Sequence, residues 1–149
     1  MKLYIMRHGQ AENTGQEQTL TAAGRADIEN LAAMLGRHGI RVKRIFHSGK
    51  TRARQTAEIM AAHISDAVTP EEHPHIKPND NPQALLGDIH QWNNDTLVVS
   101  HLPFLPTLLS LLTPAISGHP AIGFEPGTII CLSPVNDVWE IEWVESPHP

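Results

Sequence analysis

The sequence predicts an α/β fold in which helices cover both faces of a mostly parallel central sheet, with an antiparallel hairpin at the C-terminal end. Three short apolar runs typical of buried strands alternate with segments of helical periodicity, as in sheets with helical crossovers. Two further runs with strand-like alternation close the chain. A length of 149 residues suits one domain with a substantial core. We therefore expect residues 1–149 to form a single three-layer α/β/α sandwich.

The first predicted strand is the run KLYIMR at residues 2–7. The stretch that follows it, residues 8–20, is polar and is expected to be a loop. Thr21 suits the N-cap position of a helix over residues 22–38, because a threonine hydroxyl can accept a hydrogen bond from a free amide of the first turn. This helix carries one apolar stripe at helical spacing.

The second strand is predicted over the run VKRIFHS at residues 42–48, and the second helix is expected to begin near Thr51. Arg54 and Glu58 lie four residues apart in this helix, a spacing that predicts an ion pair on its outer face. Residues 66–82 contain too many prolines for a regular element. We expect this segment to be irregular.

The rest of the chain continues the alternation of helices and strands. A short helix is predicted over 82–92, a third strand over 96–101 and an apolar helix over 102–113. Residues 127–134 and 138–145 then form the predicted hairpin around a Val-Asn-Asp turn.

Two tryptophans and the single cysteine fall within this hairpin. Trp139 and Trp143 are four residues apart, so a regular strand would place both on one face of the sheet, where we expect them to pack. Cys131 lies between two apolar residues and is expected to be inert. One cysteine excludes an internal disulfide and is typical of a reducing compartment.

Composition and charge narrow the classes of partner. The formal net charge of −5 argues against a general affinity for nucleic acid or anionic membranes. Arg7 and His8 interrupt the first apolar run too early for the core of a signal peptide. We expect a cytoplasmic monomer in which any anion-binding site is local.

Charged and polar side chains follow three of the predicted strands. Arg7 and His8 end the first strand, and His101 ends the third. Arg52 follows the second strand in the first turn of a helix. The carboxyl ends of parallel strands meet at one edge of the sheet, where ligands bind in open α/β folds. We expect these four residues to form one pocket for a dianion, most obviously a phosphate group.

These residue types suit phosphoryl transfer. A neutral imidazole is a good nucleophile toward phosphorus, and its usual pKa of about 6.5 leaves it largely unprotonated at neutral pH. Arginine keeps its charge, and its planar fork matches phosphate oxygens. One histidine can attack while the arginines and the second histidine stabilise the transferring group. We expect a phosphohistidine intermediate that water hydrolyses, with no metal and no cofactor.

Two other local patterns are interpreted as structural. His73 and His75 lie on a proline-rich segment beside two glutamates, and this falls short of the three or four converging ligands of a zinc site. Ser48 lacks the preceding glycine of a nucleophile elbow. We expect Ser48 to be a turn or cap residue.

Four short motifs occur in the following order: RHG at 7–9, LTAAG at 20–24, SGKTRARQTA at 48–57 and VVSHLP at 98–103. Together they resemble the motifs of the histidine phosphatase superfamily, which also contains the phosphoglycerate mutases. They span most of the chain and keep the family's order. The resemblance implies a phosphoglycerate mutase-like fold and a hydrolase of the phosphatase type.

The resemblance also implies roles for individual residues. His8 is similar to the family's nucleophile, and Gly9 to the glycine whose carbonyl orients the other ring nitrogen of that histidine. The remaining residues of the implied phosphate pocket are Arg7, Arg52 and His101. One departure is Gly49, where the family usually has proline.

Within the family, the small size and the SHLP motif are closest to the SixA-type phosphohistidine phosphatases. The chain has little room for the insertions that enclose small substrates in larger relatives, so the resemblance implies a phosphohistidine on a partner protein, such as a histidine-containing phosphotransfer domain in signal transduction. Imidazole leaves more easily than an alkoxide, because its conjugate acid has a pKa near 6.5. A phosphohistidine substrate therefore has less need of a general acid.

Two alternatives remain open. A general phosphomonoesterase for small molecules would need a general acid, and the segment after the second helix offers Glu71, Glu72 and Asp80. None of these carboxylates lies in a motif, and Asp80 is our candidate. The other alternative is a module that binds phosphorylated proteins without turnover.

Overall fold

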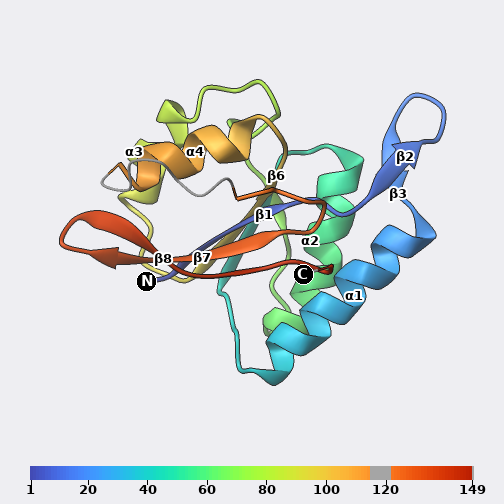
Figure 1. Ribbon diagram of the computed structural model, residues 1–149, viewed down its shortest axis with the longest axis horizontal. Helices are drawn as coiled ribbons and strands as arrows, with labels where there is room; N and C mark the ends of the chain where they lie inside the picture. Colours follow the sequence, from blue (N-terminus) through green and yellow to red (C-terminus); the bar gives the residue numbers. More distant parts are fainter. Residues whose placement is uncertain (115–121, 149) are drawn as a thin grey trace.

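The computed structural model describes residues 1–114 and 122–148 and shows three layers (Figure 1). A central sheet lies between the pair of helices α1 and α2 on one face and the pair α3 and α4 on the other. The elements are β1 (Leu3–Arg7), β2 (Ala11–Asn13), β3 (Gln18–Leu20), α1 (Ala22–Arg37), β4 (Arg44–His47), α2 (Thr51–Ile64), β5 (Glu71–Glu72), α3 (Gln83–Ile89), β6 (Thr96–Ser100), α4 (Phe104–Leu112), β7 (Ile129–Val135) and β8 (Val138–Glu145).

The described part of the central sheet has the strand order β5-β4-β6-β1-β7-β8. Strands β5, β4, β6 and β1 run parallel, whereas β7 is antiparallel to β1 and β8 is antiparallel to β7. The predicted α/β fold, with a mostly parallel sheet and a C-terminal hairpin, is confirmed. All five residues of β6 are buried, as expected for a central strand that helices cover on both faces.

The two faces of the sheet bury two separate apolar clusters. In β1, Tyr4 and Met6 pack toward α1 and α2, whereas Leu3 and Ile5 pack toward α3 and α4. This division follows from the alternation of side chains along a strand. The side chains of β1 up to Met6 are all buried in the core. The strand can therefore present charged groups only at its carboxyl end.

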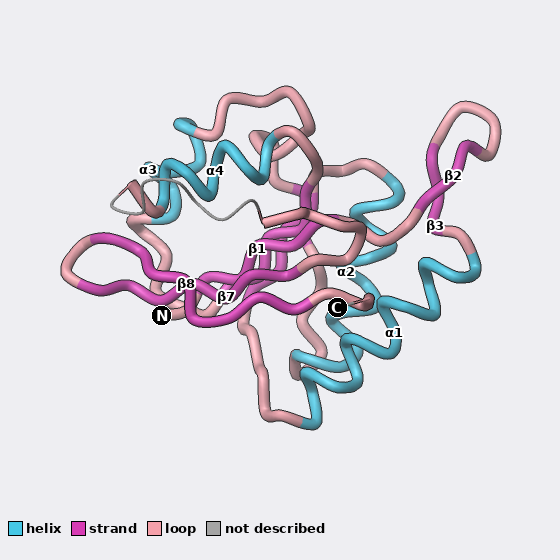
Figure 2. The backbone as a smooth tube through the Cα atoms, viewed as in Figure 1, coloured by secondary structure: helices cyan, strands magenta, loops and turns pink. Residues whose placement is uncertain are grey.

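The predicted loop at 8–20 differs from the structure, which contains a two-stranded antiparallel ribbon of β2 and β3 (Figure 2). Two hydrogen bonds hold this ribbon to α2. The Leu20 amide donates to Gln55 Oε1 at 2.9 Å, and the Thr51 hydroxyl donates to Glu17 Oε2 at 2.7 Å. These contacts join residues 34 and 35 positions apart, and the local polarity of the sequence carries no information about them.

Smaller differences occur in the segment before the third strand. The structure has a two-residue strand, β5, within the stretch predicted to be irregular. The helix predicted over 82–92 is shorter and covers Gln83–Ile89. Other local predictions are confirmed: the Thr21 hydroxyl accepts from the Gly24 amide at 2.8 Å, and Arg54 pairs with Glu58 at 2.8 Å.

The prediction that Trp139 and Trp143 share one face of the sheet is wrong. Trp139 packs with the α3 and α4 cluster, and Trp143 packs with the α1 and α2 cluster, where its ring contacts Tyr4. The pairing of β7 with β8 shifts register between Cys131 and Leu132. An extra residue in one strand reverses the alternation beyond it, so residues four apart end on opposite faces.

Helix α4, the most apolar of the helices, has nine residues and is buried against the sheet. Nowhere in residues 1–114 and 122–148 is a helix long and apolar enough to cross a membrane.

Candidate active site

The structure brings His8, His101 and the Arg52 guanidinium together at the carboxyl edge of the sheet. Strands β1 and β6 are paired in parallel with Arg7 opposite Ser100, so the residues that follow them lie side by side. The ring centroids of His8 and His101 are 5.1 Å apart. Nε of Arg52, in the first turn of α2, donates a hydrogen bond to Nε2 of His8 at 3.3 Å.

The tautomer of His8 is determined by its neighbour. Nδ1 of His8 lies 2.7 Å from the carbonyl oxygen of Gly9. A carbonyl can only accept, so Nδ1 carries the proton and Nε2 presents a lone pair. Nε2 is the atom that faces Arg52. The imidazole is thus held with its nucleophilic nitrogen beside a guanidinium.

Gly9 itself is fixed by helix α2. The Gly9 amide donates to Thr56 Oγ1 at 3.0 Å, and the Thr56 hydroxyl donates to the Arg52 carbonyl at 2.8 Å. A side chain at position 9 would place its Cβ 2.8 Å from Ile28 of α1. The glycine is therefore required by the close approach of α1 to the strand end.

Arg7 is anchored beside this pair. Its Nη1 donates to the Phe124 carbonyl at 2.7 Å. Among the described residues, three buried side-chain N or O atoms have no hydrogen-bond partner, and two of these are Arg7 Nε and His101 Nδ1. Buried polar atoms without a partner are rare in folded proteins. A tetrahedral oxyanion between Arg7 and His101 could accept from N–H groups at these positions.

Burial keeps both histidines neutral. The pKa of His8 is lowered from 6.5 to about 4, chiefly by burial; the hydrogen bond to the Gly9 carbonyl opposes this shift, and the positive charges of Arg52 and Arg7 add to it. The pKa of His101 is lowered to about 3, chiefly by burial, with contributions from the neighbouring His8 ring and from the positive charges of Arg52, Lys50 and Arg7. At neutral pH the positive charge at this edge therefore resides on the two guanidiniums.

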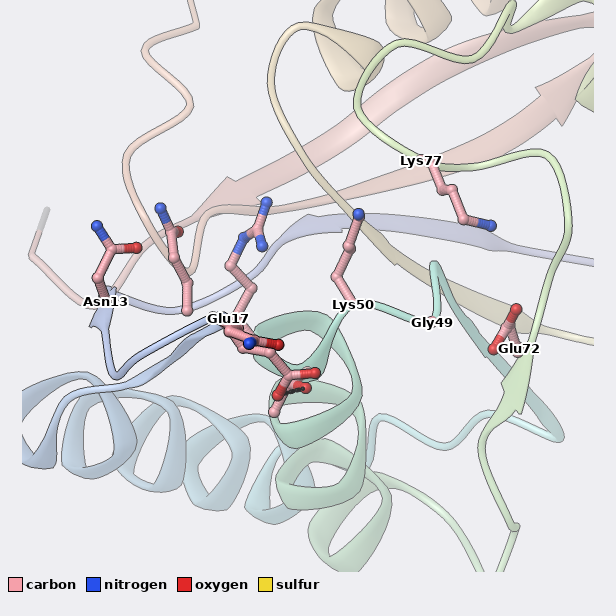
Figure 3. Close-up of a pocket in the computed structure, with 10 residues that line it drawn as sticks. Asn13, Glu17, Gly49, Lys50, Glu72 and Lys77 are labelled. Carbon is pink, nitrogen blue, oxygen red and sulfur yellow. Dashed lines mark hydrogen bonds between the residues drawn. The ribbon is translucent and has the colours of Figure 1, made fainter.

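A polar cavity of about 620 Å³ opens beside Arg52 (Figure 3). Its walls come from the β2–β3 ribbon, the start of α2 and the segment around β5. Lys50 and Lys77 line it, and its carboxylates are those of Glu17 and Glu72. Asp80, the general acid candidate from the sequence, instead accepts from the Lys77 amide at 2.9 Å.

Sequence reasoning did not identify two residues of the site, Ser48 and Thr56. Both lie within the motif at 48–57 and both are fully buried. Ser48 Oγ lies 2.6 Å from Nε2 of His101, so Ser48 is more than the turn residue that the sequence predicts. The only sequence signal was that Ser48 lies four residues before Arg52 in the same motif, and its partner on the neighbouring strand could not be deduced from the local sequence.

The histidines of the proline-rich segment have structural contacts. His73 is buried against Phe46, and its Nε2 lies 3.1 Å from Asp88 Oδ2 of α3. The His75 amide donates to His73 Nδ1 at 3.1 Å. In the part of the chain that the structure describes, no three His, Cys, Asp or Glu side chains converge as metal ligands do.

Comparisons with known proteins identify a family and several similar folds. The family profile of the histidine phosphatase superfamily (branch 1) matches residues 3–77. A search among curated proteins finds no match. Among similar solved structures is the protein histidine phosphatase SixA complexed with tungstate, at 24% identity and a TM-score of 0.87, with 99% of this chain and 97% of that chain covered. The putative phosphohistidine phosphatase SixA from Agrobacterium tumefaciens is 20% identical with a TM-score of 0.82, and the match covers 98% of this chain and 97% of that chain. A phosphoglycerate mutase from Bacillus anthracis is 14% identical with a TM-score of 0.77, and the match covers 98% of this chain and 93% of that chain.

The lowered pKa values predict the titration of the site histidines. In the ligand-free protein, the ring proton signals of His8 and His101 should stay constant from pH 8 to about 5, and His8 should begin to titrate only near pH 4. Below pH 6.5 the unfolded chain takes up protons at these rings and the folded chain does not, so the free energy of unfolding should fall as the pH drops from 6.5 toward 4. NMR titration checks this, with His8→Ala and His101→Asn for assignment. Titration of either ring near pH 6.5 would contradict the argument.

Proposed function

The chain belongs to the histidine phosphatase superfamily, and we propose that it is a phosphohistidine phosphatase that acts on a partner protein through a covalent phosphohistidine on His8. One observation carries this proposal: His8 is neutral, its Nδ1 is bound to the Gly9 carbonyl, and its Nε2 lone pair lies 3.3 Å from Arg52. A nucleophile held beside a fixed cation is the arrangement that phosphoryl transfer requires.

The proposed reaction has two steps. Nε2 of His8 attacks phosphorus, a P–N bond to His8 forms, and the P–N bond to the substrate imidazole breaks. The leaving imidazole keeps the electron pair and takes a proton from solvent. Water then attacks phosphorus, the bond to His8 breaks, inorganic phosphate leaves, and His8 returns to its neutral form. Arg7 and Arg52 stabilise the charge in both steps, so the reaction proceeds without a metal.

The cavity beside Arg52 favours a protein substrate. The cavity beside Arg52 is polar and wide, and it joins the surface between the β2–β3 ribbon and the segment around β5. Such a site admits a phosphohistidine displayed on another fold, and a histidine-containing phosphotransfer domain in cytoplasmic signal transduction is the partner that we propose for a monomeric enzyme. A similar fold binds tungstate, a tetrahedral oxyanion like phosphate.

Hydrolysis of small phosphate esters is the second candidate, favoured by the position of Glu72. This carboxylate lines the same cavity as Arg52 and could protonate an alkoxide leaving group. Asp80, the candidate from the sequence, is a hydrogen-bond acceptor for the Lys77 amide. A protonated carboxyl group is needed for esters and is dispensable for an imidazole leaving group.

Phosphoenzyme trapping tests the proposed function. The protein is mixed with a phosphotransfer domain labelled on its phosphohistidine and, separately, with p-nitrophenyl phosphate. We expect an acid-labile phosphate on the wild type and none on His8→Ala, with faster turnover of the phosphohistidine protein. Faster turnover of the ester would overturn the substrate assignment. Binding of the phosphorylated domain without phosphate release would show a binding module.

Arg52→Ala should reduce kcat/KM by about 100-fold or more, corresponding to about 3 kcal/mol, because it removes one fixed donor from the transferring group. Arg54→Ala is the matched control. Arg54 lies two residues further along the same helix, is exposed, and pairs with Glu58. Steady-state kinetics on the phosphohistidine substrate measure both variants. Equal rates in both would remove Arg52 from the site.

Glu72→Gln and Asp80→Asn separate the two candidate acids. If Glu72 protonates ester leaving groups, its amide variant should lose about 100-fold or more in ester hydrolysis and keep phosphohistidine hydrolysis, since general acid catalysis contributes about that much. Asp80→Asn serves as the comparison, and a selective loss of ester hydrolysis in that variant would assign the role to Asp80. Steady-state rates with both substrates provide the measurement.

A further inference from the structure

Ser48 and His101 form a short buried contact at the candidate active site. Ser48 directly follows β4, and His101 directly follows β6, so the contact joins neighbouring strands at their carboxyl ends. Ser48 Oγ lies 2.6 Å from Nε2 of His101. Ser48 has no exposed surface, and His101 is 1% exposed. Solvent cannot serve either group as an alternative partner.

The direction of this hydrogen bond follows from the other partners of Ser48. The Lys50 amide donates to Ser48 Oγ at 3.3 Å. If His101 also donated to Ser48, the hydroxyl proton of Ser48 would have no acceptor in a buried site, which is costly. If Ser48 donates to Nε2 of His101, the hydroxyl of Ser48 both donates and accepts, and its proton has a partner.

A hydroxyl that donates to Nε2 determines the tautomer of the ring. The pKa of His101 is lowered to about 3 by burial and by nearby cations, so the ring is neutral and carries one N–H group. With Nε2 as the acceptor, that proton is on Nδ1. Nδ1 of His101 is buried and has no partner among the described residues, and the ring lies 5.1 Å from that of His8.

We propose that Ser48 is a positioning residue which fixes His101 as its Nδ1–H tautomer, so that Nδ1–H is the group that donates to the transferring phosphoryl oxygen. This role rests on the proposed function for its place in catalysis. The positioning of His101 by Ser48 requires only that the site binds an oxyanion. In the other tautomer, the unpartnered nitrogen would present a lone pair to that oxyanion and repel it.

The chain contains a matched control, Ser100. Like Ser48 it is a fully buried serine at the carboxyl edge of the sheet, and its hydroxyl makes a hydrogen bond of the same length, 2.6 Å. Its acceptor is the carbonyl of Ile76 and not a ring nitrogen. Ser100→Ala therefore removes a comparable buried hydrogen bond and leaves the partner of His101 in place.

The experiment measures the tautomer and the oxyanion affinity separately. In protein labelled with ¹⁵N-histidine, long-range ¹H–¹⁵N spectra distinguish protonated from unprotonated ring nitrogens, and His101→Asn assigns the signals. We expect Nδ1 of His101 to be protonated in the wild type and in Ser100→Ala, and the two tautomers to be mixed in Ser48→Ala. Inorganic phosphate should bind Ser48→Ala about tenfold more weakly, by analogy with the loss when a residue that orients a metal ligand is removed.

The wild-type spectrum alone can overturn the proposal, even if Ser48→Ala does not fold: a proton on Nε2 of His101 contradicts it. An unchanged tautomer and phosphate affinity in Ser48→Ala also contradict it, as does an equal loss in Ser100→Ala. If the tautomer and phosphate results are as expected but no phosphohistidine is hydrolysed, the positioning role stands and the proposed function fails.

Discussion

The site depends on one hydrogen bond, that of 2.7 Å between Nδ1 of His8 and the carbonyl of Gly9. It directs the nucleophilic lone pair of Nε2 toward Arg52, and it requires the Gly9 peptide to keep its orientation. That peptide is held in turn by Thr56 of α2. On its other side, the missing side chain of Gly9 lets Ile28 of α1 pack against it. Two helices of one layer therefore maintain the geometry of one imidazole.

The same packing controls the charge of the site. Burial lowers the pKa of His8 and of His101, and the adjacent guanidiniums oppose protonation further. The result is a pair of neutral rings with the permanent charges on Arg7 and Arg52. Two positive charges match a phosphoryl dianion, whereas protonated histidines would have no free lone pair for attack. The core that stabilises the sheet thus also keeps His8, the proposed nucleophile, unprotonated at neutral pH.

The sequence predicted the parts of this arrangement that local patterns carry. Apolar runs ending in Arg7-His8 and in Ser100-His101 identify buried strands and the edge where they stop, and parallel pairing then brings His8 and His101 together. The partner of Ser48, the ribbon of β2 and β3 and the opposite faces of Trp139 and Trp143 could not be predicted. Each depends on a contact between distant segments or on a single inserted residue in a strand.

Gly49 shows how the chain differs locally from the motif that it resembles. Its φ is +90°, a conformation closed to proline, whose ring holds φ near −65°. Its amide donates to His47 Nδ1 at 3.0 Å, a hydrogen bond that proline cannot make. The next amide, that of Lys50, donates to Ser48. Two backbone hydrogen bonds therefore shape the turn where the family uses a rigid ring.

This turn links the two ends of the site. A Cβ at position 49 would lie 2.6 Å from the carboxyl carbon of Glu72, so the bare glycine is what allows that side chain to approach the turn along the cavity wall. On the other side, the same turn presents the Ser48 hydroxyl to His101. A side chain here would first meet the carboxyl end of Glu72, which is exposed and can move away, so the φ of +90° is the stronger constraint on this position. The left-handed conformation of Gly49 thus shapes the turn that holds the Ser48 hydroxyl against His101.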